Sequence, residues 1–204
     1  RQQLVTIADS ARTLRRILDD VLDFSRIEAG KMTVERRPMS IDDVVESTAG
    51  LYAAAAEEKG VRLRAMVDPK VGELLMGDAV RLRQVLGNLV SNAVKFTARG
   101  SVRLAVTQEA LTETHRVLRF EVTDTGAGIP DDVQSRLFMP FVRGEREITT
   151  QVGGTGLGLA LVRRIVELME GTVELRSLAG VGTAVQVRIS FERLHEETSD
   201  SRIM

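Results

Sequence analysis

Apolar residues recur along the first thirty positions at alternating steps of three and four residues. The recurring positions are Leu4, Ile7, Ala11, Leu14, Leu18 and Val21. This heptad spacing predicts a long helix with one apolar seam, and Ile17, Phe24 and Ile27 widen the seam as a helix of a four-helix bundle requires. A lone helix cannot bury such a stripe, so we expect a partner helix. Ala29 and Gly30 mark the end of this segment.

From Met32 onward the pattern changes to shorter elements. Period-two alternation or β-rich composition predicts strands over residues 32–39, 61–67, 101–108, 117–123, 173–177 and 184–191. Helical periodicity follows a capping box at Ser40 up to Gly60, follows Asp78, and covers about 131–137 and 157–169. Residues 143–154 are polar without periodicity. The sequence therefore predicts an α+β sandwich with a sheet on one side and three main helices on one face.

Three segments are expected: a stem helix over 1–30, a folded domain over 31–191, and a polar tail or linker over 192–204. Composition supports a packed core, with 43% hydrophobic and 28% charged residues. The 28 basic and 29 acidic residues nearly cancel, which argues against a nucleic-acid partner. The lack of cysteine excludes disulfides, thiolate zinc sites and a cysteine nucleophile. No apolar run approaches the roughly 18 residues that a membrane helix needs, and no signal-peptide pattern is evident. We interpret the chain, which begins at Arg1, as a fragment of a longer protein.

Amide and ammonium side chains gather on the helix that follows Asp78. Asn88 and Asn92 are four residues apart and share one helix face, and Lys95 lies three residues further on. Amide oxygens beside a lysine suit a magnesium ion with phosphate. The alternative is a polar helix face that simply meets water.

A strand that ends in an acid leads into a glycine-rich turn. The residues are Asp124, Thr125, Gly126, Ala127 and Gly128. A carboxylate there can accept a hydrogen bond from an exocyclic amine, and the glycines let the backbone approach a flat ring. An ordinary turn and an aspartic protease, whose signature is also Asp-Thr-Gly-Ala, are the alternatives.

A second glycine-rich stretch runs from Gly153 to Gly158 directly into an apolar helix. Glycines before a helix N-terminus expose amides and form an anion site. The stretch is not a Walker loop, because the Gly-Lys-Ser/Thr ending is missing, and Leu159 stands where a dinucleotide loop needs its third glycine. A flexible linker is the weaker alternative. His115 and His195 are isolated, which favours surface positions for both.

The order and spacing of these pieces resemble the sensor histidine kinases, which have the Bergerat-type α/β sandwich. Residues 88–96 are similar to the N box, 124–128 to the first glycine box, and 138–141 to the F box. Residues 154–158 and 180–183 are similar to the second and third glycine boxes, and 23–31 to the end of the second stem helix, especially in hybrid kinases. The resemblance covers about residues 1–191, and it argues against the protease, which needs neither the asparagine helix nor a glycine lid.

The resemblance implies a role for each matching residue. Asn92 with Asn88 would hold Mg²⁺ between the phosphates of ATP, and Lys95 would contact a phosphate. Residues 143–153 would form a lid in which Arg143 reaches the γ-phosphate, so that Lys95 and Arg143 are the catalytic candidates. The remaining nucleotide contacts implied are Phe96 and Asp124 at the adenine, with Gly126, Gly128, Ile129, Phe141, Gly154, Thr155, Gly156, Leu157, Gly158 and Thr183.

The implied activity is transfer of the ATP γ-phosphoryl group to a histidine on the first stem helix, for relay to an aspartate of a response-regulator receiver domain. No such histidine stretch occurs here, so the chain would need a phosphoacceptor helix from elsewhere. The resemblance also implies that the parent protein forms a homodimer through its stem. We expect a cytoplasmic location for this portion, with an inner-membrane anchor of the parent left open. A degenerate ATP-binding scaffold and an anti-sigma-type serine kinase are alternatives. A related ATPase of the gyrase type is a further one, although Asn88 stands where that group has its general-base glutamate.

Overall fold

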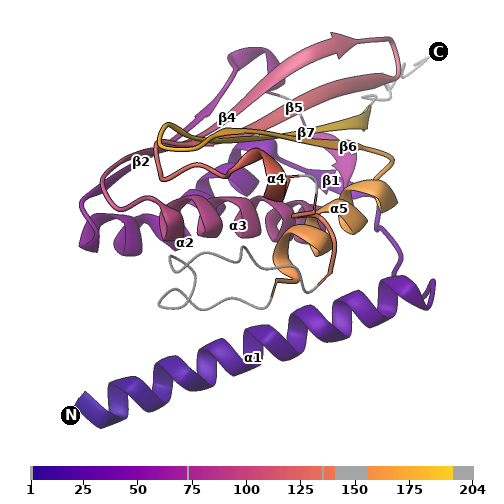
Figure 1. Cartoon of the computed structure of the whole chain (residues 1–204). Helices are drawn as coiled ribbons and strands as arrows, with labels where there is room; N and C mark the ends of the chain where they lie inside the picture. The colour runs from indigo at the N-terminus through magenta and orange to yellow at the C-terminus, as the bar shows by residue number, and fades with distance from the viewer. Residues whose placement is uncertain (1, 73, 135, 141–155, 195–204) are drawn as a thin grey trace, which may run out of the picture.

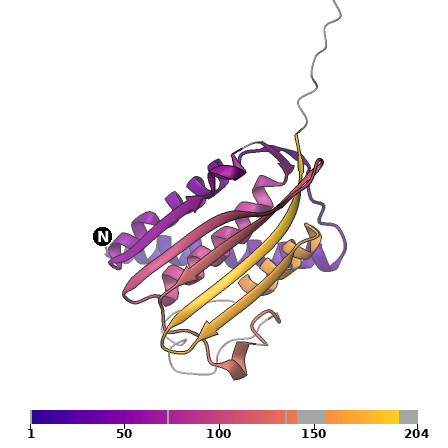
Figure 2. The same cartoon turned by 90° about the horizontal axis from the view of Figure 1, so that it is seen from above.

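The computed structural model describes residues 2–72, 74–134, 136–140 and 156–194, without the side chains of residues 2–10, 12, 13, 16 and 17. One sheet forms the upper layer in Figure 1, helices α2, α3 and α5 lie beneath it, and α1 runs along the far side of the helices. The helices cover one face of the sheet, and Figure 2 shows the other face uncovered. This is the predicted α+β sandwich with its helices on one face.

The seven strands form a single mixed sheet in the order β1-β3-β7-β5-β4-β2, with β6 paired to β7. Their bounds are β1 Arg37–Met39, β2 Val61–Val67, β3 Leu75–Gly77, β4 Gly100–Leu111, β5 His115–Asp124, β6 Thr172–Leu178 and β7 Gly182–Arg193. Strand β2 runs parallel to β4, and every other pair is antiparallel. Because β5 lies between β4 and β7, its last residue, Asp124, lies where the central strands of the sheet end and not on an edge strand.

The helices are α2 Ile41–Glu58, α3 Ala79–Phe96, α4 Asp131–Gln134 and α5 Gly158–Leu168, with a short 3₁₀ turn at Pro69–Val71. Ser40 caps α2, and Asp78 caps α3 by accepting from the N–H groups of Val80 and Arg81. Such caps satisfy helix-terminal N–H groups that have no partner within the helix. Buried side chains of α3, α5 and the inner face of the sheet form one core, in which Leu86, Leu161 and Phe120 are fully buried.

Helix α1, Gln2–Glu28, contacts the domain through the C-terminal part of its length. Asp23 Oδ2 accepts from Arg81 Nη1 at 3.2 Å and from Gln84 Nε2 at 2.8 Å, both on α3. Glu28 pairs with Arg164 of α5 at 2.9 Å. Farther along α1, Leu14, Leu18, Val21 and Leu22 remain exposed. The predicted role of this helix in a bundle therefore stays a prediction, supported by an apolar surface that the described residues leave uncovered.

The structure differs from the predicted elements in several places, and helix α4, predicted over about 131–137, ends at Gln134. The strand predicted over 32–39 is wrong for residues 32–36, because only 37–39 find a partner strand, in β3. Strand β3 has three residues, which is too short to show alternation, and the sequence did not indicate it. Strand β7 continues to Arg193, two residues into the expected tail, because Glu192 and Arg193 pair with β3.

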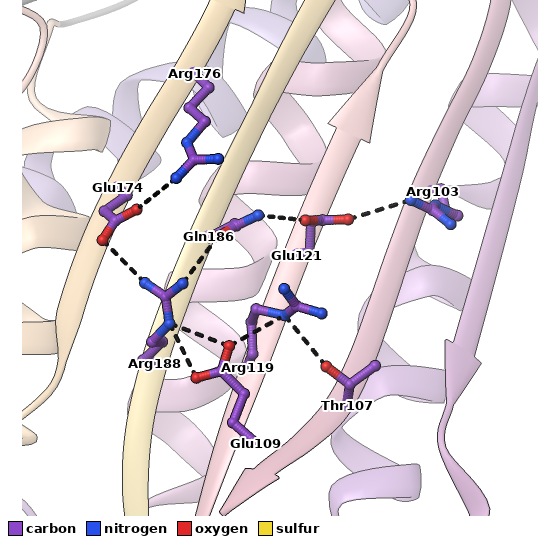
Figure 3. A network of polar contacts seen from close by, with 9 residues as sticks. All are labelled: Arg103, Thr107, Glu109, Arg119, Glu121, Glu174, Arg176, Gln186 and Arg188. Carbon is purple, nitrogen blue, oxygen red and sulfur yellow. Dashed lines mark hydrogen bonds and ion pairs between the residues drawn. The ribbon is translucent and has the colours of Figure 1, made fainter.

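A network of charged and amide side chains covers the open face of the sheet (Figure 3). Arg188 of β7 donates to Glu109 at 3.0 Å and to Glu174 at 3.0 Å, and Glu109 also pairs with Arg119 at 3.4 Å. A second group links Glu121 to Arg103 and to Gln186. Cross-strand pairs of opposite charge stabilise neighbouring strands, so this face is polar and the core lies on the helix side.

Candidate functional site

One face of α3 presents the amide side chains predicted to bind a metal. Asn88 and Asn92 are both half-buried, one helical turn apart. Lys95 and Phe96 end the helix, where Lys95 Nζ lies 4.9 Å from the centroid of the Phe96 ring. The Phe96 side chain is 40% exposed, although most large apolar residues of α3 are buried. An exposed aromatic ring beside an ammonium group gives this end of α3 a surface suited to a flat ligand.

The start of α5 lies directly against this face of α3. A methyl group added at Gly158 would lie 3.4 Å from Oδ1 of Asn88. Helix α5 begins at Gly158 after Leu157, whose apolar side chain makes no capping hydrogen bond. The first N–H groups of a helix have no partner within the helix, and the Leu157 side chain supplies none. Uncapped N–H groups and the helix dipole attract anions such as phosphate, and here they adjoin an asparagine.

The loop after β5 makes a close approach to the end of α3. The N–H of Gly126 donates to Asp124 Oδ1 at 2.8 Å. A methyl group at Gly126 would lie 2.6 Å from the carbonyl oxygen of Phe96 and 2.8 Å from Asp124 Oδ1, closer than real atoms approach. Only glycine fits here, and this contact brings Asp124 next to Phe96.

The turn between β6 and β7 forms the remaining side. The N–H of Gly180 donates to the carbonyl oxygen of Ala127 at 2.7 Å. Gly128 has φ +65°, and a methyl group on it would collide with the carbonyl oxygen of Leu178. Gly182 likewise lies against the carbonyl of Asp124. The glycine-rich turns at 126–128 and 180–182 therefore pack backbone against backbone, and this close contact explains why both contain glycine.

The Asp124 carboxyl lies at the centre of this arrangement. Burial raises its pKa above the usual range, while the backbone N–H groups of Gly126 and Thr183 act in the opposite direction. Thr183 lies opposite Asp124 in the neighbouring strand. A partly desolvated carboxylate held by backbone donors can accept a hydrogen bond from an amine of a bound ring.

Two residues that the sequence interpretation missed hold the loop in place. Ser177 Oγ accepts from the N–H of Ile129 at 2.8 Å. Gln134 Nε2 donates to the carbonyl oxygens of Ile129 at 2.8 Å and of Ser177 at 3.0 Å. Ser177 had a detectable signal, because it occupies the position after Val173 and Leu175 where alternation in β6 calls for an inward apolar residue. Gln134 had none.

Several predicted site residues lie outside the described residues. These are Phe141, Arg143, Gly154 and Thr155, together with the predicted lid over 143–153 and His195. Gly156 has φ +72° and precedes α5. Leu157 is buried, with 1% of the residue exposed. His115 is exposed on the sheet, away from the site residues.

These residues fit a divalent cation held with phosphate better than a cation held by protein alone. Asn88 and Asn92 offer two neutral amide oxygens, and Mg²⁺ accepts such ligands when phosphates and water complete its shell. Among the residues whose placement is described, no group of three or more His, Cys, Asp or Glu side chains is arranged to hold a metal. The donor chemistry therefore favours a cation that arrives with a polyphosphate.

Comparison with known proteins gives one consistent family. Residues 77–193 match the family described as histidine kinase-, DNA gyrase B- and HSP90-like ATPase. The chain is 40% identical over 192 residues to the autoinducer 2 sensor kinase/phosphatase LuxQ of Vibrio harveyi, which is 93% of this chain and 22% of LuxQ. It is 36% identical to the signal transduction histidine-protein kinase BarA of Escherichia coli K12, over 94% of this chain and 21% of BarA.

A solved structure has the same fold. Full-length ShkA, crystallised in complex with AMPPNP, superposes with a TM-score of 0.80 and 31% identity, over 96% of this chain and 40% of ShkA. The chain spans about a fifth of the length of the curated relatives named above. Within the part that the structure describes, no helix has the length and apolarity needed to cross a bilayer.

Proposed function

Because this chain belongs to the histidine kinase-, DNA gyrase B- and HSP90-like ATPase family, we propose that it is the ATP-binding catalytic portion of a sensor histidine kinase. It would transfer the γ-phosphoryl group of ATP to a histidine on a separate helix, for relay to a receiver-domain aspartate. The observation that carries the proposal is the meeting of three distant segments. The asparagine face of α3 adjoins the start of α5 at Gly158, and the end of α3 adjoins Gly126 and Asp124.

Each side of the site has its own task in this proposal. Asp124 would accept a hydrogen bond from the amino group of adenine, with Phe96 beside the ring. Gly126 and Gly128 would shape the base site by their close packing against Phe96 and Leu178. Asn88 and Asn92 would hold Mg²⁺ against the phosphates. When bound, this ion would neutralise negative charge on the phosphate oxygens.

The phosphate end would be completed by cationic and amide groups. Lys95 would contact a phosphate, and the N–H groups at the start of α5 would receive phosphate oxygens. Arg143, with a lid over 143–153, is proposed from the sequence resemblance alone. Phosphoryl transfer depends mainly on positioning and on stabilisation of negative charge. These groups would position the phosphates and stabilise their negative charge.

The acceptor histidine would come from another helix. Neither His115 nor His195 lies in the sequence context of an acceptor, and the exposed apolar residues of α1 need a partner. Those residues are Leu14, Leu18, Val21 and Leu22. We propose that the first stem helix, from the same parent chain and from a second copy, packs there. A response-regulator receiver domain is the proposed second partner.

An ATPase of related fold is the competing function. Its chemistry needs a side chain that takes a proton from water, and Asn88 occupies the position where the gyrase-like relatives carry a glutamate. A carboxamide does not accept that proton at neutral pH. We therefore expect no more than a trace of steady ATP hydrolysis, and robust phosphate release would favour the ATPase.

A direct test mixes the chain with a separate protein that carries a first stem helix and with ATP labelled at the γ-phosphate. Acid-labile label on the helix protein is the expected result. Asn92→Ala should abolish the transfer and Mg-dependent ATP binding, while Arg83→Ala, an exposed position on the same helix, should leave both unchanged. ATP binding without transfer to any helix would instead favour the degenerate scaffold.

A further inference from the structure

The hydroxyl of Ser177 is the centre of a small hydrogen-bonded cluster beside the proposed base site. It accepts from the N–H of Ile129 at 2.8 Å, and it lies 2.9 Å from the carbonyl oxygen of Gly182 and 2.8 Å from Oγ1 of Thr183. The cluster joins the loop after β5 to the last two strands. None of the roles proposed above uses Ser177.

These three contacts fix the direction of each hydrogen bond. A hydroxyl has one hydrogen and two lone pairs. The N–H of Ile129 can only donate, and the carbonyl of Gly182 can only accept. Ser177 must therefore give its one hydrogen to Gly182, which leaves its second lone pair for Thr183. The Thr183 hydroxyl is consequently the donor in its contact with Ser177.

This assignment determines what Thr183 offers to a ligand. Its hydrogen is directed at Ser177, so its free lone pairs make it a hydrogen-bond acceptor on its other side. Asp124 lies opposite Thr183 in the neighbouring strand, and its ionised carboxylate also only accepts. The two residues therefore form a pair of acceptors at the edge of the sheet.

We propose that Ser177 is a specificity-determining residue that acts through Thr183. By holding the Thr183 hydroxyl as an acceptor beside Asp124, it makes the site select a base that carries an amino group and reject one that carries a carbonyl oxygen at the same position. This inference rests on the proposed function, because it assumes that the purine ring binds at Asp124.

Gln134 of α4 strengthens the arrangement from the other side. Its amide Nε2 has two hydrogens and lies within hydrogen-bond distance of three acceptors, the carbonyl oxygens of Ile129 and Ser177 and, at 2.9 Å, Asp131 Oδ1. These contacts tie α4 to both Ile129 and Ser177, the two residues that the Ile129 N–H bond joins. A binding site discriminates strongly against a ligand that leaves its buried polar groups unpaired.

The test compares two nucleotides that differ in this feature. ADP has an amino group at purine position 6, and inosine diphosphate has a carbonyl oxygen there. Calorimetric titration with Mg²⁺ should show that the wild-type chain prefers ADP. In Ser177→Ala the Thr183 hydroxyl is free to turn and donate to the carbonyl, so the ratio of the two affinities should fall roughly tenfold. Ser177→Thr should restore the ratio, and Ser190→Ala, exposed on β7, should not change it.

A double-mutant cycle separates this role from a structural one. Thr183→Val removes the hydroxyl that Ser177 orients, so it should lower the ratio by itself, and Ser177→Ala should have no further effect in that background. An unchanged ratio of the two affinities in a folded Ser177→Ala would overturn the inference, whether or not both nucleotides bind more weakly. If Ser177→Ala does not fold, an unchanged ratio in Thr183→Val overturns it. Failure of the wild-type chain to bind either nucleotide would instead overturn the proposed function.

Discussion

Replacement of Gly128 by alanine tests whether the contact between the two glycine turns builds the site. Gly128 has φ +65°, and an added methyl group would collide with the carbonyl oxygen of Leu178. Gly60 provides a matched control, because its φ is +66° and an added methyl group would meet nothing within 4 Å. The two substitutions share the backbone strain and differ in the collision.

The expected cost follows from these two terms. An L-residue in the left-handed region loses about 1–2 kcal/mol, which is the whole expected effect of Gly60→Ala on the free energy of unfolding. In Gly128→Ala the colliding atom is backbone, which no rotamer change can move. Relief requires the loop and the turn to separate, which breaks the 2.7 Å bond from Gly180 N–H to the Ala127 carbonyl, at a further cost of about 1 kcal/mol.

Urea unfolding and ADP titration together measure the outcome. Gly128→Ala should lose about 1 kcal/mol more stability than Gly60→Ala. It should also bind ADP about tenfold more weakly than the wild type, because displacement of the loop after β5 also displaces Asp124 from the base. Gly60→Ala should bind ADP like the wild type. Equal unfolding free energies and equal ADP affinities for the two variants would refute the reasoning.

Three further predictions test separate parts of the structure. Burial raises the pKa of Asp124, so ADP affinity should begin to fall at a higher pH than for an ordinary carboxyl, and Asp124→Asn should flatten this dependence in titrations from pH 7 downward. The same raised pKa makes the stability contributed by Asp124 largest below its unfolded-state pKa, and this stability is lost as the pH rises through the folded-state pKa. Protonation of Asp124 therefore does not unfold the protein at low pH, and unfolding does not explain a fall in ADP affinity as the pH is lowered. Leu86→Ala, at a fully buried position, should lower the free energy of unfolding by roughly 2–5 kcal/mol in urea titration. A loss below about 1 kcal/mol, half of the lower limit of that range, would contradict the place of Leu86 in the core. Glu109→Gln should lower the melting temperature slightly at low salt and hardly at all in concentrated salt, because the partners of Glu109, Arg119 and Arg188, lie on the open face of the sheet.

Helical periodicity predicted the fold well where an element was long enough to show it. The apolar positions of α3 and α5 and the capping residue Asp78 located those helices within a residue or two. Strand β3 was not predictable, since three residues carry no period and its pairing with β1 and β7 is a long-range property. The continuation of β7 to Arg193 has the same cause.

The candidate site shows the same division between local and long-range information. Gly126 and Gly128 were predicted to let the backbone approach a flat ligand ring. The structure shows that each lies against a protein carbonyl, of Phe96 and of Leu178 respectively, so packing within the chain already requires glycine at both positions. The sequence could not show that Ser177, some fifty residues away, would meet Ile129. Its polar side chain at an inward position of β6 was the available sign.

The central claim is that the residues of α3, the loop after β5 and the start of α5 together bind the nucleotide. A crystal structure of the chain with Mg²⁺ and a non-hydrolysable ATP analogue tests this most directly. The account predicts the purine beside Phe96 with its amino group hydrogen-bonded to Asp124, the ion at Asn88 and Asn92, and the phosphates at the N-terminus of α5. A purine bound anywhere else on the molecule would contradict it.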